Sequence, residues 1–343
     1  MRVLVTGGAG YIGSHACLAL LERGHEVLSL DVMLPGRASH EAIETLRQLG
    51  GAGFEAHEGD INDSAALDRV LAGRGVDAVM HFAGVAYIGE SVRDPLLYHR
   101  TNTAGTISVL EACARHRVKR FVFSSSCVTY GEPGAALLPV TEDCPQVPTN
   151  PYGWSKLAAE RVLRDTHASG RGRGAGGSGF ACAALRYFNV AGCDRRGRVG
   201  HRHNPETRVI PLVIRAAIGI DPGFTVFGAD YATEDGTCIR DYIHVDDLVR
   251  AHIIALEALR DDEHRTYNLG TGAGVSVRQI IESVERVTGR RVPVTTGPRR
   301  EGDPAALFCS PEKAWRELGW RAEVTDLDEI VRSAWTWLER TLR

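Results

Sequence analysis

Two ionisable side chains near the middle of the chain are spaced to work together. Tyr152 and Lys156 closely follow Pro151, and a proline at the first helical position opens a helix without removing a needed N–H. Residues four apart lie on one face of a helix, so the phenol and the ammonium can point into the same pocket. A neighbouring positive charge favours the phenolate and lowers the pKa of a tyrosine from its ordinary value of about 10. The pair can therefore remove a proton from an alcohol.

A glycine-rich turn near the amino terminus has the order of a dinucleotide-binding unit. A buried parallel strand is predicted over 2–6, residues 7–13 spell GGAGYIG, and a helix is predicted over 14–23. Glycines let the backbone approach a pyrophosphate, and the amino terminus of a helix stabilises its charge. The next strand, 26–30, ends at Asp31, whose carboxylate can accept hydrogen bonds from ribose hydroxyls and repels a 2′-phosphate. The pattern favours NAD over NADP.

The same alternation of strands and helices continues along the chain. Strands are predicted over 54–58, 78–82, 120–124 and 181–186, and helices over 64–72 and 103–116, the latter with Ile107, Leu110 and Ala114 on its buried stripe. This order predicts an α/β fold with a Rossmann-type, doubly wound parallel sheet, whose ligands bind at the carboxyl ends of the strands. The residues expected to gather there are Gly84, Ser126, Tyr152 and Asn189.

Two domains are expected, because the pattern becomes less regular after residue 189. We expect residues 1–189, with 237–262 packing back onto them, to form the NAD-binding domain. Residues 190–236 and 263–343 are expected to form a smaller, discontinuous substrate domain. The glycine-rich insert 170–179 is expected to be a flexible surface loop.

The composition is that of an ordinary globular protein. The 343 residues are 43% hydrophobic with a formal net charge of −3, so no nucleic-acid partner is expected. No apolar run approaches the length of a membrane span and no signal-peptide cleavage region follows Met1, so we expect a cytoplasmic protein without a membrane partner. The eight cysteines are scattered, with no spacing typical of a metal site, so we expect free thiols and no metal.

The motifs along nearly the whole chain resemble those of the extended short-chain dehydrogenases/reductases, and within that family the UDP-glucose 4-epimerases. The motifs that carry the resemblance are GGAGYIG (7–13), Asp31, GDI (59–61), HFAG (81–84), GES (89–91), SSS and YG (within 124–131), PYGWSK (151–156), RYFNVAG (186–192), HNPET (203–207), TEDGTCIRDYIHVDDL (233–248), YNLGTG (267–272) and RREGD (299–303).

The resemblance implies roles for particular residues. Tyr152 is implied to be the catalytic base, Lys156 its electrostatic partner, and Ser126 a hydroxyl that hydrogen-bonds the reacting sugar oxygen. The implied NAD contacts are Gly7, Gly10, Tyr11, Ile12, Gly13, Asp31, Asp60, Ile61, Phe82, Ala83, Gly84, Asn102, Ser124, Lys156 and Tyr187. The implied UDP-sugar contacts are Ser126, Tyr152, Asn189, Arg208, Val226, Phe227, Arg240, Arg300 and Asp303. Guanidinium groups match the forked oxygens of a diphosphate.

The activity that the resemblance implies is that of an isomerase. An NAD-dependent UDP-sugar 4-epimerase would interconvert UDP-glucose and UDP-galactose through a 4-keto intermediate. A homodimer formed by the helices at 103–116 and 151–168 is also implied.

Four alternatives remain open at this point. The basic residues between 195 and 208 fit a UDP-glucuronate 4-epimerase, and SSSCVTYGEP and DGTCIRDYI also resemble UDP-xylose and UDP-arabinose 4-epimerases. By the same resemblance, Leu307 stands where the room for the 2-substituent of the sugar is set, so the acceptance of N-acetylated sugars also stays open. A sugar-nucleotide dehydratase is disfavoured, because Cys127 and Val128 stand where its acid/base pair is needed. A non-catalytic NAD-binding sensor need not keep the Tyr/Lys pair, Ser126 and the arginines together.

Overall fold

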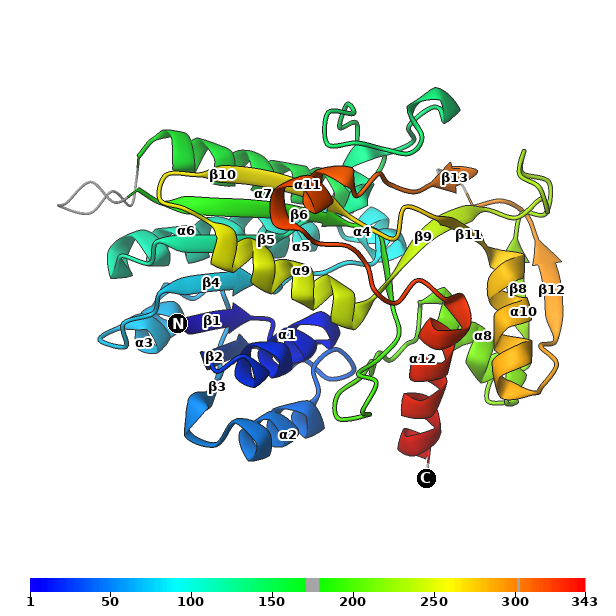
Figure 1. Ribbon diagram of the computed structural model, residues 1–343, viewed down its shortest axis with the longest axis horizontal. Helices are drawn as coiled ribbons and strands as arrows, with labels where there is room; N and C mark the ends of the chain where they lie inside the picture. The colour runs from blue at the N-terminus through cyan, green and yellow to red at the C-terminus, as the bar shows by residue number, and fades with distance from the viewer. Residues whose placement is uncertain (171–178, 301–302, 343) are drawn as a thin grey trace. The chain divides into compact units, whose positions relative to one another are not determined.

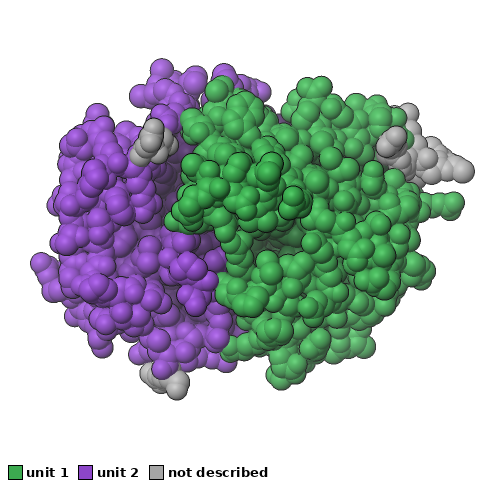
Figure 2. Space-filling view, turned by 180° about the vertical axis from the view of Figure 1, so that it is seen from behind, with its two compact units in different colours: residues 1–131, 146–186, 249–267 green, residues 132–145, 187–248, 268–343 purple. Residues whose placement is uncertain are grey.

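The computed structural model describes residues 1–170, 179–300 and 303–342. The chain forms two compact units, which Figure 2 shows in different colours. The first unit consists of residues 1–131, 146–186 and 249–267, and the second of residues 132–145, 187–248 and 268–343. The interior of the expected loop, 171–178, lies outside the described residues. Within the described ranges, no helix is both long and apolar enough to cross a membrane.

A seven-stranded sheet follows the predicted doubly wound topology, and it lies in the first unit except for the last residues of its strands β6 and β10. Its strands run in the order β10-β6-β5-β4-β1-β2-β3, from top to bottom in Figure 1. The strands are β1 (Arg2–Thr6), β2 (Glu26–Asp31), β3 (Phe54–Glu58), β4 (Ala78–His81), β5 (Arg120–Ser124), β6 (Ala181–Tyr187) and β10 (His264–Leu269). The pairs from β3 to β6 are parallel, and the central strands are buried along nearly their whole length, as their continuous apolar runs predict. The strand order reverses between β1 and β4, which is where such folds bind dinucleotides.

Helices α3, α6 and α7 share a hydrophobic core with the sheet. The helices of this region are α1 (Tyr11–Glu22), α2 (His40–Gly50), α3 (Ser64–Leu71), α4 (Ile88–Arg93), α5 (Pro95–Tyr98), α6 (Gly105–His116), α7 (Pro151–Ala168) and α9 (Val245–Ala258), with a π-helical segment, η2 (His99–Ala104), directly before α6. Of the expected stripe on α6, Leu110 is buried as predicted, whereas Ile107 and Ala114 are exposed. Thr106, Val109, Leu110 and Cys113 are buried, whereas Ile107 is 37% exposed. Because α6 contacts α3 and α7, these neighbours select its inner face, which periodicity alone could not distinguish.

The second unit contains a four-stranded sheet, a two-stranded sheet and a helical core. The strands are β7 (Asn189–Ala191), β9 (Ile239–His244), β11 (Gly274–Ser276) and β13 (Ala306–Leu307) in one sheet, and β8 (Phe224–Phe227) with β12 (Val294–Gly297) in the other. Helices α8 (Val209–Ala217), α10 (Val277–Thr288) and α12 (Leu327–Leu342) contribute to one apolar core, and α11 (Glu312–Leu318) precedes α12.

The bounds of the two units differ from the expected domains. Residues 132–145 belong to the second unit, because the N–H of Val140 donates to the carbonyl of Phe308 (2.9 Å) and the Asn268 amide donates to the carbonyl of Val140 (3.1 Å). Residues 237–248 also belong there, because β9 pairs with β7, β11 and β13. Such pairings between distant segments leave no local signal in the sequence.

Candidate active site

The glycine turn after β1 is shaped by close backbone approaches. A Cβ placed on Gly7, whose φ is +74°, would lie 2.7 Å from the nitrogen of Ala83, and a Cβ on Gly13 would lie 2.0 Å from the carbonyl oxygen of Gly7. Only glycine fits at these two positions. Gly10 caps α1 without a side chain, and the first turn of α1 carries no acidic residue. The helix therefore presents its positive end and its backbone N–H groups, including those of Tyr11 and Ile12, as phosphate-binding helices do.

Asp31 ends β2 and holds the glycine turn beside it. Its carboxylate accepts hydrogen bonds from the N–H groups of Ala9 and Met33, each at 3.0 Å. Partial burial raises the pKa of the carboxyl from its ordinary value, and the backbone hydrogen bonds oppose this rise. Asp31, which is predicted to bind the ribose, therefore lies directly beside the glycine turn that is predicted to bind the phosphates.

Tyr152 and Lys156 lie on the first turns of α7, as predicted. The side chain of Asn150 caps this helix by accepting from the N–H of Gly153 (2.9 Å). Lys156 is 4% exposed, and its ammonium donates to the carbonyl of Ser124 (2.9 Å) and lies 5.0 Å from the Phe123 ring centroid. Burial lowers the pKa of Lys156 to about 8, and the charge of Glu160 acts in the opposite direction. The carbonyl of Ser124 thus fixes where the ammonium sits.

The ring of Tyr152 is held by a second tyrosine. It is 7% exposed and packs edge-on against Tyr98, with the ring centroids 6.0 Å apart and the planes at 71°. The Tyr98 hydroxyl lies 2.6 Å from the carbonyl oxygen of Tyr87 and 2.9 Å from a carboxylate oxygen of Glu90. These contacts fix the hydroxyl end of Tyr98, and its ring limits the positions open to the Tyr152 ring.

Asn102 connects the loop after β4 to α7. Its side-chain oxygen accepts a hydrogen bond from the N–H of Val85 (2.9 Å). Its side-chain nitrogen donates to the carbonyl of Val85 (3.0 Å) and to the hydroxyl of Ser155 (2.9 Å). A Cβ on Gly84 would lie 2.7 Å from the Asn102 oxygen and 3.4 Å from the Lys156 nitrogen. The structure thus brings Gly84, Asn102 and Lys156 together. The hydrogen bonds of Asn102 assign it a positioning role, and its contact with NAD stays a prediction.

The remaining predicted residues of the first unit have varied surroundings. Ser126 begins the short helix η3 (Cys127–Tyr130), where its hydroxyl accepts from the N–H of Val128 at 3.4 Å. Asp60 is exposed and accepts from the N–H of Asn62, Ile61 is buried in the core, and the Phe82 ring centroid lies 4.8 Å from that of His252.

The predicted UDP-sugar residues of the second unit form two side-chain pairs. Arg240 on β9 makes an ion pair with Asp303, and the guanidinium of Arg300 lies 4.1 Å from the Phe227 ring centroid. The other three lie on nearby elements of this unit: Asn189 begins β7, Val226 is buried on β8, and the N–H of Arg208 donates to Glu206 (2.9 Å) at the start of α8. The guanidinium groups needed for a diphosphate are thus present, and one of them is held by a carboxylate.

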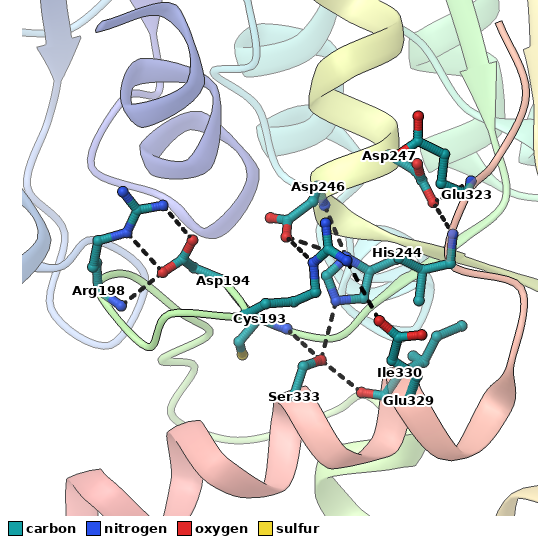
Figure 3. Close-up of polar contacts among 12 residues, drawn as sticks. Cys193, Asp194, Arg198, His244, Asp246, Asp247, Glu323, Glu329, Ile330 and Ser333 are labelled. Atoms are coloured by element: carbon teal, nitrogen blue, oxygen red, sulfur yellow. Dashed lines mark hydrogen bonds and ion pairs between the residues drawn. The ribbon is translucent and has the colours of Figure 1, made fainter. Parts of the chain in front are cut away.

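Several basic residues of the 195–208 segment are paired with acids of the same unit. Figure 3 shows the guanidinium of Arg198 on the carboxylate of Asp194, at 2.7 Å. Arg195 lies 3.5 Å from both Asp246 and Glu329, and the His201 ring lies 2.8 Å from Glu206. Beside them, Ser333 accepts from the N–H of Cys193 and contacts His244, each at 3.1 Å (Figure 3). These contacts hold the 195–208 segment in place, and the carboxylates neutralise part of its positive charge.

Sequence reasoning missed four residues that shape the site. Tyr98 holds Tyr152, and Asp241 accepts from the N–H groups of Thr271 and Gly272 in the YNLGTG motif. Glu160 and Arg186 form a buried ion pair next to Lys156. Only Glu160 had a local signal, because it lies four residues after Lys156 on the same helical face.

The fold and the site together define a dinucleotide-binding enzyme of the short-chain dehydrogenase/reductase type. Residues 3–270 match the NAD dependent epimerase/dehydratase family, and the chain belongs to that family. It is 44% identical to the UDP-glucose 4-epimerase of Halalkalibacterium halodurans over 98% of this chain and 95% of the relative.

Two solved structures extend this likeness to the whole fold. One is a UDP-glucose 4-epimerase from Stenotrophomonas maltophila with bound NAD and formylated UDP-arabinopyranose, which is 39% identical with a TM-score of 0.93 and covers 100% of this chain and 99% of that one. The other is the Bifidobacterium longum UDP-glucose 4-epimerase with NAD+ and UDP, also 39% identical, with a TM-score of 0.92 and the same coverage.

Proposed function

We propose that this protein is an NAD-dependent UDP-sugar 4-epimerase that interconverts UDP-glucose and UDP-galactose. The observation that carries the proposal is the buried Lys156 ammonium, anchored on the carbonyl of Ser124, with Tyr152 four residues earlier on α7 and Ser126 two residues beyond the anchor. An ammonium so placed favours the phenolate of Tyr152. The names of the relatives agree with this chemistry.

The residues around the glycine turn fit NAD. Backbone atoms of Ala83 and Gly7 already stand where the Cβ atoms of Gly7 and Gly13 would be, so only glycine permits this tight turn, and α1 begins after it without an acidic side chain. Asp31 supplies the acceptor for the ribose hydroxyls. When bound there, NAD would supply reversible hydride transfer at C4 of the sugar.

The chain's own residues would manage the proton and the sugar nucleotide. Tyr152 would take the proton of the sugar 4-hydroxyl and later return it, while Lys156 stabilises the phenolate. Ser126 would hydrogen-bond the same oxygen. Arg240 and Arg300 would bind the diphosphate, and Asp303 the uridine ribose. In this proposal the first unit binds NAD and the second binds the UDP portion.

A second candidate is 4-epimerisation of a UDP-pentose. The relative from Stenotrophomonas maltophila was solved with formylated UDP-arabinopyranose, and the motifs SSSCVTYGEP and DGTCIRDYI favour the same class. The glucuronate alternative depends on the basic residues of the 195–208 segment, of which Arg195 and His201 already pair with carboxylates inside the second unit. A dehydratase is disfavoured because the first residue after Ser126 is the buried Cys127.

A panel of UDP-sugars tests the proposal. The purified chain would be incubated with UDP-glucose, UDP-xylose, UDP-glucuronate or UDP-N-acetylglucosamine without added cofactor, and the 4-epimers separated by chromatography. UDP-galactose should form fastest, and Tyr152→Phe should abolish its formation while leaving NAD bound. Much faster conversion of UDP-xylose or UDP-glucuronate would reject the hexose assignment, and the absence of any 4-epimer would reject the activity.

We also propose a homodimer formed through α6 and α7. These helices contact each other within the chain and expose Ile107 (37%) and Trp154 (49%). Sedimentation at micromolar concentration should give the mass of two chains, and a single-chain mass would reject the dimer.

A further inference from the structure

A buried ion pair lies one helical turn beyond Lys156. Glu160 and Arg186 each have 3% of their side-chain surface exposed, and the guanidinium of Arg186 lies 2.7 Å from the carboxylate. Arg186 also donates to the Tyr130 hydroxyl and to the Gln146 side chain, each at 2.9 Å. The Gln146 amide donates back to Glu160 at 3.2 Å. The network is closed and lies wholly inside the first unit.

The same carboxylate reaches the catalytic groups through the serine segment after β5. The hydroxyl of Ser125 donates to Glu160. Ser125 stands between Ser124, whose carbonyl holds the Lys156 ammonium, and Ser126, which is proposed to bind the sugar oxygen. Glu160 therefore fixes the segment that carries both groups, and it does so from the helix that carries Tyr152 and Lys156.

Stability alone does not account for a buried ion pair at this place. Burying two charges is costly, and replacing a buried ion pair by apolar residues is often neutral or stabilising. The negative charge of Glu160 can instead help to keep Lys156 protonated, because burial alone lowers the pKa of Lys156 and favours loss of its proton. Among the described residues, Tyr152 lies four residues earlier on the same helix, and His81 on β4 interacts electrostatically with Lys156. Burial, and then the Lys156 charge, lower the pKa of His81 to about 3, so His81 is neutral.

We propose that Glu160 is a positioning residue for the epimerisation, which holds the Ser124–Ser126 segment in place and keeps the ammonium of Lys156 charged beside Tyr152. Arg186 acts through Glu160 by fixing its carboxylate. This inference rests on the proposed function for its role in turnover, but its effect on Lys156 is independent of the substrate.

The small number of lysines allows a direct test. The chain contains Lys119, Lys156 and Lys313 as its three lysines, so NMR of ¹³Cε-labelled lysine would give three signals, assigned with Lys119→Arg and Lys313→Arg. In Glu160→Gln the Lys156 signal should titrate at a lower pH than in the unchanged chain. The alkaline limb of the kcat/KM profile should move to lower pH with it. A control is Asp165→Asn, which removes an exposed carboxylate that pairs with Arg161 on the same helix (2.9 Å) and should move neither.

A second variant guards against misfolding. Glu160→Gln leaves Arg186 buried without a counter-charge, whereas Glu160→Gln combined with Arg186→Gln removes both charges and should fold. The Lys156 signal should also titrate at a lower pH in this double variant. In Glu160→Asp it should titrate between the values of Glu160→Gln and the unchanged chain. An unchanged Lys156 titration in the folded double variant would overturn the inference. If the unchanged chain epimerises no sugar, the proposed function fails, but the NMR titration still supports or overturns the effect of Glu160 on Lys156.

Discussion

Replacing Lys156 by methionine is expected to stabilise the chain at neutral pH while abolishing turnover. The side chain is 4% exposed, and its pKa falls from an ordinary 10.5 to about 8 in the folded chain, chiefly through burial. Each pH unit corresponds to about 1.4 kcal/mol, so keeping the proton at pH 7 costs the folded chain about 3 kcal/mol. Losing the hydrogen bond to the carbonyl of Ser124 offsets about 1 kcal/mol. Lys156→Met should therefore gain about 2 kcal/mol at pH 7.

The gain should depend on pH in a definite direction. Between the folded and unfolded pKa values of Lys156, the unfolded chain keeps a proton that the folded chain has lost, so the stability of the unchanged chain rises with pH over that window. By pH 9.5 the advantage of Lys156→Met should have fallen by about 2 kcal/mol, to near zero. Other groups titrate in both chains and cancel in the difference.

Urea denaturation at pH 7 and at pH 9.5 measures this difference. The control is Lys119→Met, because Lys119 is exposed and its replacement should change stability by less than about 0.5 kcal/mol at either pH. A loss of stability in Lys156→Met at pH 7, or a gain of the same size at both pH values, would refute the argument that burial of the charge is costly.

Three further substitutions test separate parts of the site. Tyr152→Phe should reduce turnover by at least about a thousandfold, with NAD content, measured by chromatography of the released nucleotide, unchanged. Gly13→Ala should lower the free energy of unfolding in urea by about 3 kcal/mol or more and should lose NAD, because its Cβ would lie 2.0 Å from the carbonyl oxygen of Gly7. In the control Gly10→Ala the nearest contact of the Cβ is 3.2 Å, so the loss of stability should be clearly smaller. Asp31→Ser should improve binding of NADP relative to NAD by about tenfold or more in nucleotide titrations, because a repelling carboxylate is removed.

Local signals in the sequence were sufficient for much of the fold. The apolar run of β1 and the glycines that follow it predict the observed strand and turn, and Ser276 with Gln279 forms the capping box that begins α10. By contrast, β10 was not expected, because it starts with polar residues and joins the sheet only through β6, far away in the sequence. Elements that are stabilised by distant partners lack a pattern of their own.

The same distinction applies to the site. The spacing of Tyr152 and Lys156 predicts their common face, because the helix itself sets it. The partner of Glu160 comes from β6, 26 residues along the chain, and that of Arg195 from α12, 134 residues along. Pairing of these charges therefore emerged only from the folded chain.

A 4-epimerase of the proposed kind removes and returns the same hydrogen at C4 of a UDP-sugar. The most direct measurement is incubation of the purified chain with UDP-glucose deuterated at C4, followed by mass spectrometry of the UDP-galactose formed. The product should keep the deuterium at C4 without added NAD. Exchange of that deuterium for solvent hydrogen, or release of reduced cofactor in proportion to product, would contradict this mechanism.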